Sequence, residues 1–162
     1  MFQCAESQPL THEITLRPVG DSDRAFLFAL YVSTREDLAL LDASVGGPLL
    51  EMQYRAQQSQ YQSAWPAAVD SLVLVAGEPA GHMLVAYDDT AVRLIDVALL
   101  PQYCGRGVGA TLLRELISNA GKLPVQLSVA VGNPAIKLYE RLGFTITGES
   151  QTYFEMATTP AI

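Results

Sequence analysis

The chain has few of the residues that build metal sites and disulfide-rich folds. Its 162 residues include two cysteines, Cys4 and Cys104, and two histidines, His12 and His82. The cysteines lie far apart in the sequence, so they form neither a paired metal-ligand spacing nor a disulfide framework. With so few ligands of this kind, we expect no structural zinc site and no metal cofactor.

Long apolar runs and an excess of cations are also absent. No stretch approaches the roughly 20 apolar residues that cross a bilayer, and residues 1–8 lack the basic start and apolar segment of a signal peptide. Ten Lys and Arg residues face seventeen Asp and Glu residues, for a net charge of −7, whereas nucleic-acid binding needs clustered cations. We therefore expect a cytoplasmic protein that binds neither membranes nor nucleic acids. Its acidic surface either serves solubility or attracts cationic amines.

Hydrophobic residues make up 49% of the chain, which supports a packed core. The length suits one domain, and we expect a loose tail at residues 1–12 before a single domain at 13–158. Alternating apolar residues predict strands at 14–18, 72–75, 83–87, 92–100, 125–131, 145–147 and 152–156. Helical spacing predicts a helix after Asp21 or Asp23, a second at 49–63 after a break at 43–48, a third at 107–120 and a short one from Pro134.

The order of these elements indicates how the sheet is connected. Three short strands in succession, with turns at 77–81 and 88–90, are typical of an antiparallel meander. The strand, helix and strand between residues 92 and 131 then indicate a parallel pair with a right-handed crossover. The second helix carries a glutamine-rich face that we expect to be solvated: Gln57, Gln58, Gln60 and Gln62.

A glycine-rich turn joins the strand that ends at Leu100 to the helix that follows. The turn consists of Cys104, Gly105, Arg106, Gly107, Val108, Gly109 and Ala110. Alternate glycines let the backbone curl without Cβ clashes, and the amides at a helix start attract an anion such as a pyrophosphate. Arg106 adds a cation beside them. On the glycines alone, the segment is either such an anion site or a turn without a ligand.

Two other phosphate-binding motifs fit this turn less well. The Gly-Lys-Ser/Thr ending of a P-loop is missing. Gly105, Gly107 and Ala110 do fit the dinucleotide fingerprint, which expects an acidic residue about 20 positions later. No Asp or Glu lies between Glu115 and Glu140, so a dinucleotide-binding domain is disfavoured.

The stretch from Val97 to Leu113 resembles the acetyl-CoA motif of the GNAT acetyltransferase superfamily. That motif has Arg or Gln, two residues, Gly, one residue, and Gly or Ala. Cys104, Gly107 and Gly109 occupy these places here. Cys104 departs from the usual first residue and removes one side-chain anchor, which puts the coenzyme affinity in doubt. It is either a neutral replacement or a thiol that reacts next to the thioester.

Residues 133–144 resemble the second signature of the same family, and residues 30–36 look like a stretch found in bacterial members of undefined substrate. Asn133 is a helix N-cap or a coenzyme contact. Tyr139 shares a helix face with apolar residues, so the pattern alone makes it a core tyrosine. The resemblance implies instead that Tyr139 faces the coenzyme sulfur and protonates the departing thiolate, a task that suits a phenol.

The resemblance implies a mixed α/β fold. A central, mostly antiparallel sheet of six or seven strands would contain one splayed parallel pair and carry helices on both faces. Backbone near Val97 and Leu99 would line the acetyl and pantetheine groups. Asp96, in an otherwise apolar run, is either a structural anchor or the base that takes the proton of the amine. Alternation places it on the face opposite Val97.

We expect the acceptor to be recognised by Tyr31, Arg35, Glu36 and His82, although each also has an ordinary surface explanation. Arg35 would suit an acceptor that carries a carboxylate. The implied reaction moves acetyl from acetyl-CoA directly to a primary amine of a small molecule or peptide, with no metal and no covalent enzyme intermediate. The alternatives are a non-catalytic acyl-CoA-binding module and a transferase of longer acyl groups. The oligomeric state is open, although family members often form homodimers.

Overall fold

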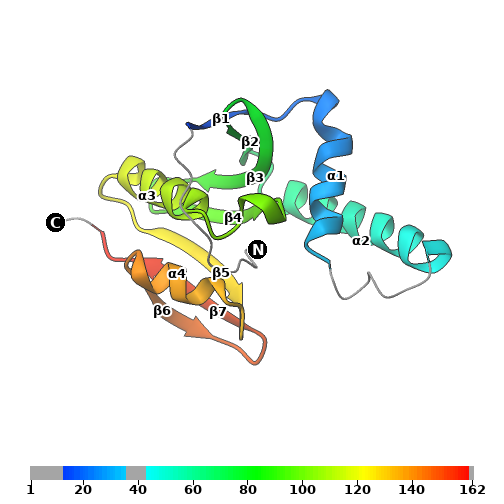
Figure 1. Ribbon diagram of the computed structural model, residues 1–162. Helices are drawn as coiled ribbons and strands as arrows, with labels where there is room; N and C mark the ends of the chain where they lie inside the picture. Colours follow the sequence, from blue (N-terminus) through cyan, green and yellow to red (C-terminus); the bar gives the residue numbers. More distant parts are fainter. Residues whose placement is uncertain (1–12, 36–42, 161–162) are drawn as a thin grey trace.

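The computed structural model describes residues 13–35 and 43–160, which form a twisted sheet with helices on both sides (Figure 1). The predicted tail at residues 1–12 lies outside the described residues. Seven strands make up the sheet: β1 (Ile14–Pro18), β2 (Val69–Val75), β3 (Glu78–Tyr87), β4 (Val92–Leu99), β5 (Val125–Ala130), β6 (Phe144–Glu149) and β7 (Tyr153–Thr158). Their order is β1-β2-β3-β4-β5-β7-β6.

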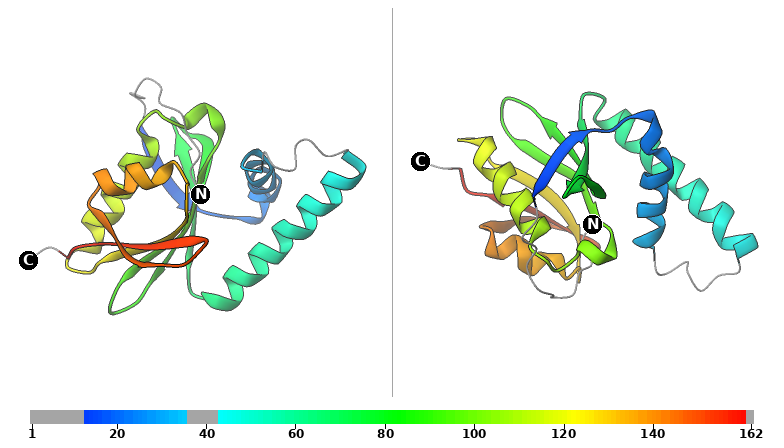
Figure 2. Two further views of the ribbon diagram at one scale, coloured as in Figure 1. Left: turned by 90° about the horizontal axis from the view of Figure 1, so that it is seen from below. Right: turned by 45° about the horizontal axis from the view of Figure 1, so that its top comes forward.

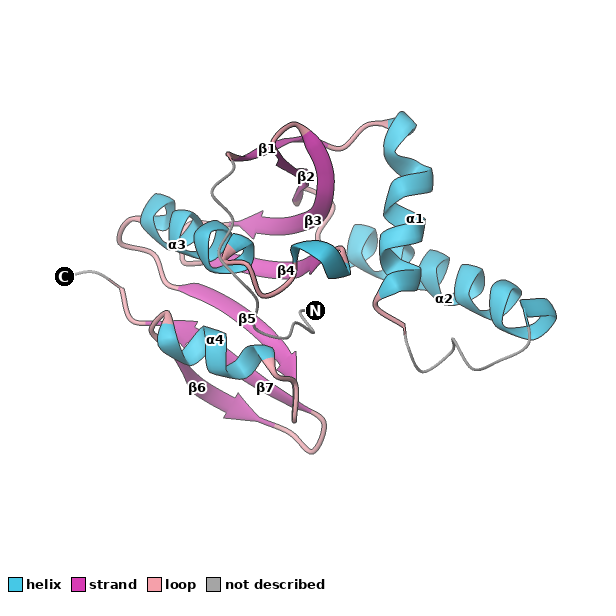
Figure 3. Ribbon diagram, viewed as in Figure 1, coloured by secondary structure: helices cyan, strands magenta, loops and turns pink. Residues whose placement is uncertain are grey.

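All neighbouring strands are antiparallel except β4 and β5, which are parallel. Four helices complete the described fold (Figure 3): α1 (Arg24–Ser33), α2 (Ala43–Ala64), α3 (Val108–Ala120) and α4 (Ala135–Arg141). Helices α3 and α4 lie on one face of the sheet, and α1 and α2 lie on the other (Figure 2). The expected mixed α/β fold with one parallel pair is therefore confirmed.

The main core lies between the sheet and helices α3 and α4. Helix α3 buries Val108, Leu112, Leu113 and Leu116 on one face, as its spacing predicts. It ends at Gly121, whose φ of 61° is in the left-handed region, which glycine adopts without a steric penalty. Within the described residues, every helix is too short or too polar to span a lipid bilayer.

Two local predictions are wrong. Helix α2 begins at Ala43 and contains Pro48, whereas a break was expected at 43–48. A proline inside a helix removes one hydrogen bond and its ring crowds the carbonyl four residues earlier, but Pro48 lies near the start of a long helix, and α2 continues through it. Strand β3 begins at Glu78, so Gly81 lies in a strand and not in the predicted turn. A Cβ at Gly81 would lie 2.3 Å from the carbonyl oxygen of Ala98, so glycine is needed there for close packing of β3 against β4.

Candidate active site

The parallel strands β4 and β5 separate after a short paired stretch. Residues 92–94 of β4 pair with residues 125–127 of β5, and the last pair is Leu94 with Leu127. Within the described residues, β4 then continues to Leu99 with β3 as its only strand partner. The splayed pair that the resemblance implied is thus present, and the β4 edge that faces the gap includes the backbone of Val97 and Leu99.

A β-bulge sits where the strands separate. Leu84 pairs with Asp96 and Val85 pairs with Leu94, so Ile95 is an extra residue in β4. The bulge explains why Leu94 and Val97 both lie in the main core although three positions separate them, since strict alternation would place them on opposite faces. Asp96 consequently lies on the opposite face from Val97, as predicted, under helices α1 and α2.

The turn at 104–110 has the backbone that its glycines predict. Gly105 and Gly107 have φ angles of 68° and 83°, values that disfavour residues with a Cβ. Gly107 is the N-cap of α3, and the first hydrogen bond of the helix runs from the Thr111 amide to the Gly107 carbonyl at 3.0 Å. The amides of residues 108–110 precede that bond, so the helix itself leaves them without partners. This geometry fits a pyrophosphate.

The side chains of the turn contribute less than its backbone. Val108 is fully buried in the core, so only its amide could face a ligand, while Arg106 is half-buried. A Cβ at Gly107 would find no atom within 4 Å, so the space next to this backbone is open. These observations support the turn as the place where coenzyme A would bind.

Cys104 is disulfide-bonded, contrary to the expectation that the two cysteines form no disulfide framework. Sequence separation says little about distance in the fold, and this is why spacing alone misled. The other cysteine of the chain, Cys4, lies outside the described residues. The Cys104 sulfur also lies 3.7 Å from the carbonyl oxygen of Leu99. Without a free thiol, Cys104 cannot react with the thioester in this state.

Tyr139 is the largest fully buried side chain of α4. Its ring packs against Phe144 with centroids 5.7 Å apart, and its exposed fraction is 0%. Its hydroxyl is buried without a hydrogen-bond partner among the described residues. Burial, followed by the negative charge of Asp96, raises the pKa of Tyr139, so the phenol stays protonated. A buried donor without a partner is costly, and it fits a ligand atom that would accept its proton.

A cavity of about 280 Å³ opens on the face of the sheet under α1 and α2. Its walls come from both helices and from the separated ends of β4 and β5. Five of the predicted site residues line it together: Tyr31, Arg35, His82, Asp96 and Asn133. Glu36, the remaining acceptor candidate, lies outside the described residues. Within the described residues, no group of three or more His, Cys, Asp and Glu side chains is arranged to hold a metal ion.

Asn133 also lines this cavity. Its side-chain oxygen accepts a hydrogen bond from the Ala135 amide at 2.9 Å, which is the predicted capping contact, although α4 begins at Ala135 and not at Pro134. Both interpretations of Asn133 are therefore compatible with its position.

His82 lies between two carboxylates at the floor of the cavity. Its Nε2 atom hydrogen-bonds to Oδ1 of Asp70 on β2, and its Nδ1 atom is 4.0 Å from Oδ2 of Asp96 on β4. Burial lowers the pKa of His82, but the hydrogen bond to Asp70 and the charges of Asp70 and Asp96 outweigh this effect and raise it overall. The charge on His82 is thus controlled by the residues around it.

The roof of the cavity is aromatic. Tyr54 of α2 packs against Tyr31 and Phe28 of α1, with ring centroids 5.2 and 5.4 Å apart. Arg35 donates a hydrogen bond from Nη1 to the Tyr31 hydroxyl at 2.7 Å. Burial and the charge of Asp70 raise the pKa of Tyr54. An aromatic roof above carboxylates suits a cationic group.

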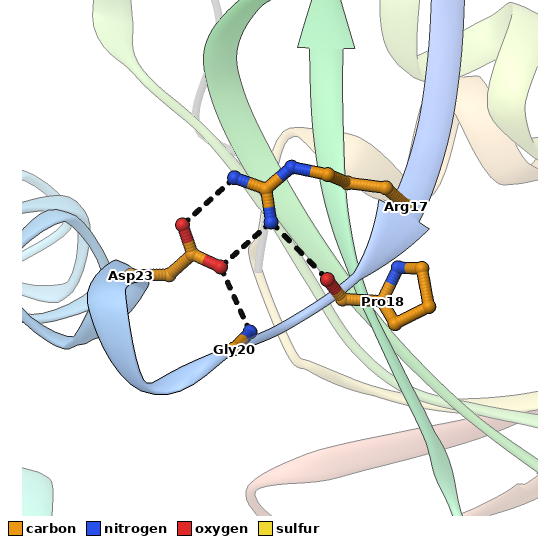
Figure 4. A network of polar contacts seen from close by, with 4 residues as sticks. All are labelled: Arg17, Pro18, Gly20 and Asp23. Atoms are coloured by element: carbon orange, nitrogen blue, oxygen red, sulfur yellow. Dashed lines mark hydrogen bonds and ion pairs between the residues drawn. The ribbon is translucent and has the colours of Figure 1, made fainter.

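Helix α1 is held in position by an ion pair at its start (Figure 4). Arg17 of β1 donates two hydrogen bonds of 2.8 Å to the carboxylate of Asp23, which also accepts one of 2.8 Å from the Gly20 amide. Asp23 thus occupies the N-cap position of α1 without a capping hydrogen bond to the helix. Its side chain ties the sheet to the helix that carries Tyr31 and Arg35.

The sequence interpretation missed the three cavity residues that α2 contributes. Tyr54, Gln57 and Gln58 line the cavity from α2, and both glutamines are half-buried, although a solvated face was predicted. Their spacing is that of one helix side, but only the docking of α2 beside α1 shows that this side faces the sheet.

Comparisons with known proteins agree with this geometry. Residues 69–146 match the family model described as an acetyltransferase (GNAT) domain. Among solved structures, the PaiA N-acetyltransferase of Thermoplasma acidophilum in complex with coenzyme A has a TM-score of 0.70 at 18% identity, over 91% of this chain and 99% of that one. A Corynebacterium glutamicum protein described as histone acetyltransferase HPA2 and related acetyltransferase has a TM-score of 0.66 at 21% identity, over 92% of this chain and 97% of that one.

No curated protein sequence matches the chain, and the similar structures are too distant in sequence to show more than the fold. The matched segment runs from β2 to β6 and includes both predicted motifs. Residues 69–146 of the chain therefore resemble a GNAT acetyltransferase domain.

Proposed function

We propose that the protein is an N-acetyltransferase that moves an acetyl group from acetyl-CoA to a primary amine. The observation that carries this proposal is the hydroxyl of Tyr139, buried and without a partner among the described residues. Such a donor needs an acceptor, and the sulfur of the thioester would supply one. The glycine turn, the splayed strands and the family-model match support the same assignment.

Each part of the bound donor would have its own place. Amides of residues 106–110 would hold the pyrophosphate at the start of α3, with Cys104 and Gly105 shaping the turn. Backbone of Val97 and Leu99 would align the pantetheine and acetyl groups along the gap beyond Leu94. Asn133 would flank them from the β5 side.

The reaction would then be a direct displacement. Asp96 would take a proton from the acceptor ammonium, which leaves a neutral nitrogen that can attack the acetyl carbon. As the carbon–nitrogen bond forms and the carbon–sulfur bond breaks, Tyr139 would give its proton to the departing sulfur. The nitrogen would lose its second proton as the amide forms, and this proton would return Tyr139 to its neutral form. The net products are an N-acetyl amine, the free thiol of coenzyme A and one proton.

The cavity would hold the acceptor. The Asp96 carboxylate and the rings of Tyr31 and Tyr54 suit the cationic end of an amine. Arg35, hydrogen-bonded to Tyr31, would meet the other end of the molecule, and the amides of Gln57 and Gln58 suit polar groups between the two. A volume of about 280 Å³ favours a small molecule or a peptide terminus.

The test has two arms. Calorimetry should detect coenzyme A binding to the purified protein. Thiol release from acetyl-CoA with a panel of amines should identify an acceptor, and mass spectrometry of the product should show one acetyl group added to the amine. Asp96→Asn should lower turnover, whereas Glu115→Gln, an exposed carboxylate on α3, should not. Coenzyme binding without turnover on any amine would instead favour a non-catalytic binding module.

A further inference from the structure

The proposed reaction leaves a proton on Asp96, and this proton has to leave before the next turnover. Asp96 lies in an enclosed position, with 18% of its side chain exposed, and His82 beside it is 9% exposed. Asp70 lies beyond His82, with 38% exposed. The three groups therefore form a line from the cavity floor toward solvent.

We propose that His82 relays the proton of the acceptor amine from Asp96 to Asp70 and so to solvent. This inference rests on the proposed function. It assigns roles to two residues, His82 and Asp70, that the transfer chemistry itself does not require.

Strand register brings the three groups together. His82 lies opposite Leu72 of β2 and opposite Ala98 of β4. Asp70 and Asp96 are each two positions away from those partners, and side chains two positions apart on a strand share a face. Asp96 lies on the same side of the bulge as Ala98, so ordinary alternation places it on this face. Three adjacent strands thus each contribute one titratable side chain to one row.

The hydrogen bond to Asp70 sets which ring nitrogen carries the proton. An ionised carboxylate only accepts hydrogen bonds, so neutral His82 must donate from Nε2 to Asp70. Its Nδ1 atom then has a free lone pair on the side of Asp96. A proton that enters at Nδ1 can be matched by one that leaves from Nε2 to Asp70 and then to solvent, so the charge of the ring does not change. The ring is left as the Nδ1–H tautomer, and proton exchange with solvent has to return it to the Nε2–H form before the next turnover.

The distance between His82 and Asp96 is compatible with this transfer. The 4.0 Å between Nδ1 and Oδ2 is about 1 Å longer than a hydrogen bond, and a side-chain rotation of Asp96 closes such a gap. Catalytic hydrogen bonds are commonly long before substrates bind.

The charges around His82 determine how turnover should depend on pH. Asp70 from β2 and Asp96 from β4 face the ring, and Tyr31, Arg35 and Tyr54 of α1 and α2 line the cavity above it. The pKa of His82 is raised, and only the neutral ring can accept a proton from Asp96. Turnover should therefore rise with pH through a value above 6.5, the ordinary pKa of histidine.

Two conservative variants test the relay by kinetics. His82→Gln keeps a hydrogen-bonding side chain but cannot titrate, so it should lose the acidic limb of the kcat profile and about 100-fold in kcat, with KM little changed. Asp70→Asn removes the group that accepts the relayed proton, so kcat should fall. It also removes a charge that raises the pKa of His82, so the limb should move to lower pH. Glu115→Gln is the matched carboxylate control and should keep the wild-type profile.

A weakly basic acceptor, such as methoxyamine, is already neutral at pH 7, so Asp96 does not have to remove an ammonium proton before the nitrogen attacks. The His82→Gln defect should be much smaller with this amine. An equal defect with both amines, or an unchanged acidic limb in the variant, would overturn the relay.

A spectroscopic measurement of the His82 tautomer tests the relay even if no acceptor is found. Nitrogen NMR shifts of the His82 ring, assigned by their loss in His82→Gln, should show the neutral Nε2–H tautomer with coenzyme A bound. A neutral Nδ1–H tautomer would refute the relay, because the lone pair would then face Asp70. A lack of turnover on every amine would refute the proposed function and leave the NMR result to decide the geometry.

Discussion

Replacement of Tyr139 by phenylalanine should make the protein more stable and less active. The hydroxyl of Tyr139 is fully buried and has no hydrogen-bond partner among the described residues. An unsatisfied buried polar group costs about 1–3 kcal/mol, and phenylalanine has the same ring without it. Tyr139→Phe should therefore raise the free energy of unfolding by about 1–2 kcal/mol, which corresponds to about 2–4 °C in Tm for each kcal/mol in a chain of this size.

The same change should slow the reaction. General acids contribute about 10²- to 10⁴-fold to enzyme rates, and a thiol with a pKa of about 8.5 leaves readily, so the lower end applies. We expect kcat to fall about 100-fold, or about 2.7 kcal/mol, with little change in the affinity for coenzyme A. Turnover by thiol release and stability by urea unfolding measure the two effects.

Opposite signs for stability and activity separate a functional tyrosine from a structural one. Tyr87→Phe is the control, because Tyr87 is 59% exposed and its change should affect neither quantity. If Tyr139→Phe were less stable than the wild type, the hydroxyl would have a partner and the reasoning would fail. Unchanged turnover would remove the acid role.

Three further changes test the turn, the strand packing and the anchor of α1. Gly107→Ala imposes a Cβ at a φ of 83°, so it should cost about 1–2 kcal/mol of stability and weaken coenzyme A binding roughly tenfold, as measured by calorimetry. Gly81→Ala places a Cβ 2.3 Å from the Ala98 carbonyl oxygen, so it should lower the stability against thermal unfolding by about 1–3 kcal/mol or more. An unchanged Tm would mean that β4 can shift to make room for the Cβ. The hydrogen bonds from Arg17 and the Gly20 amide lower the pKa of Asp23 from 3.8 to about 2, so its contribution to stability is complete above 3.8 and is lost as pH falls toward 2. In Asp23→Asn, the free energy of unfolding in urea should depend less on pH over that range. A pH dependence equal to that of the wild type would contradict the contribution of the ion pair.

Local patterns predicted most of the fold and the backbone of the glycine turn. The glycine turn, the helix after it and the position of Tyr139 depend on residues that are close in sequence, so spacing was enough to find them. Helix α2 was predicted to start too late, because the glycines and the proline of residues 43–48 were taken for a break before the helix. The location of the protein and its oligomeric state remain predictions.

The acceptor side could be predicted only as a set of separate residues. Tyr31, His82 and Asp96 come from three distant segments, and the cavity that joins them exists only after α1 and α2 dock on the sheet. Asp70 showed no signal in the sequence, since its role follows from the strand register with His82. Cys104 could not be assigned for the same reason, because a cross-link depends on distance in space.

Because Ile95 is an extra residue in β4, its deletion would remove the bulge. Leu94 and Asp96 already point to opposite faces, so a chain lacking Ile95 would keep every neighbouring side chain on its present side of the sheet. What it would lose is the bend at which β4 leaves β5. The variant without Ile95 should still fold, but β4 and β5 should stay paired beyond Leu94 and close the gap proposed for the thioester. Titration with coenzyme A should then show a folded protein with weakened binding.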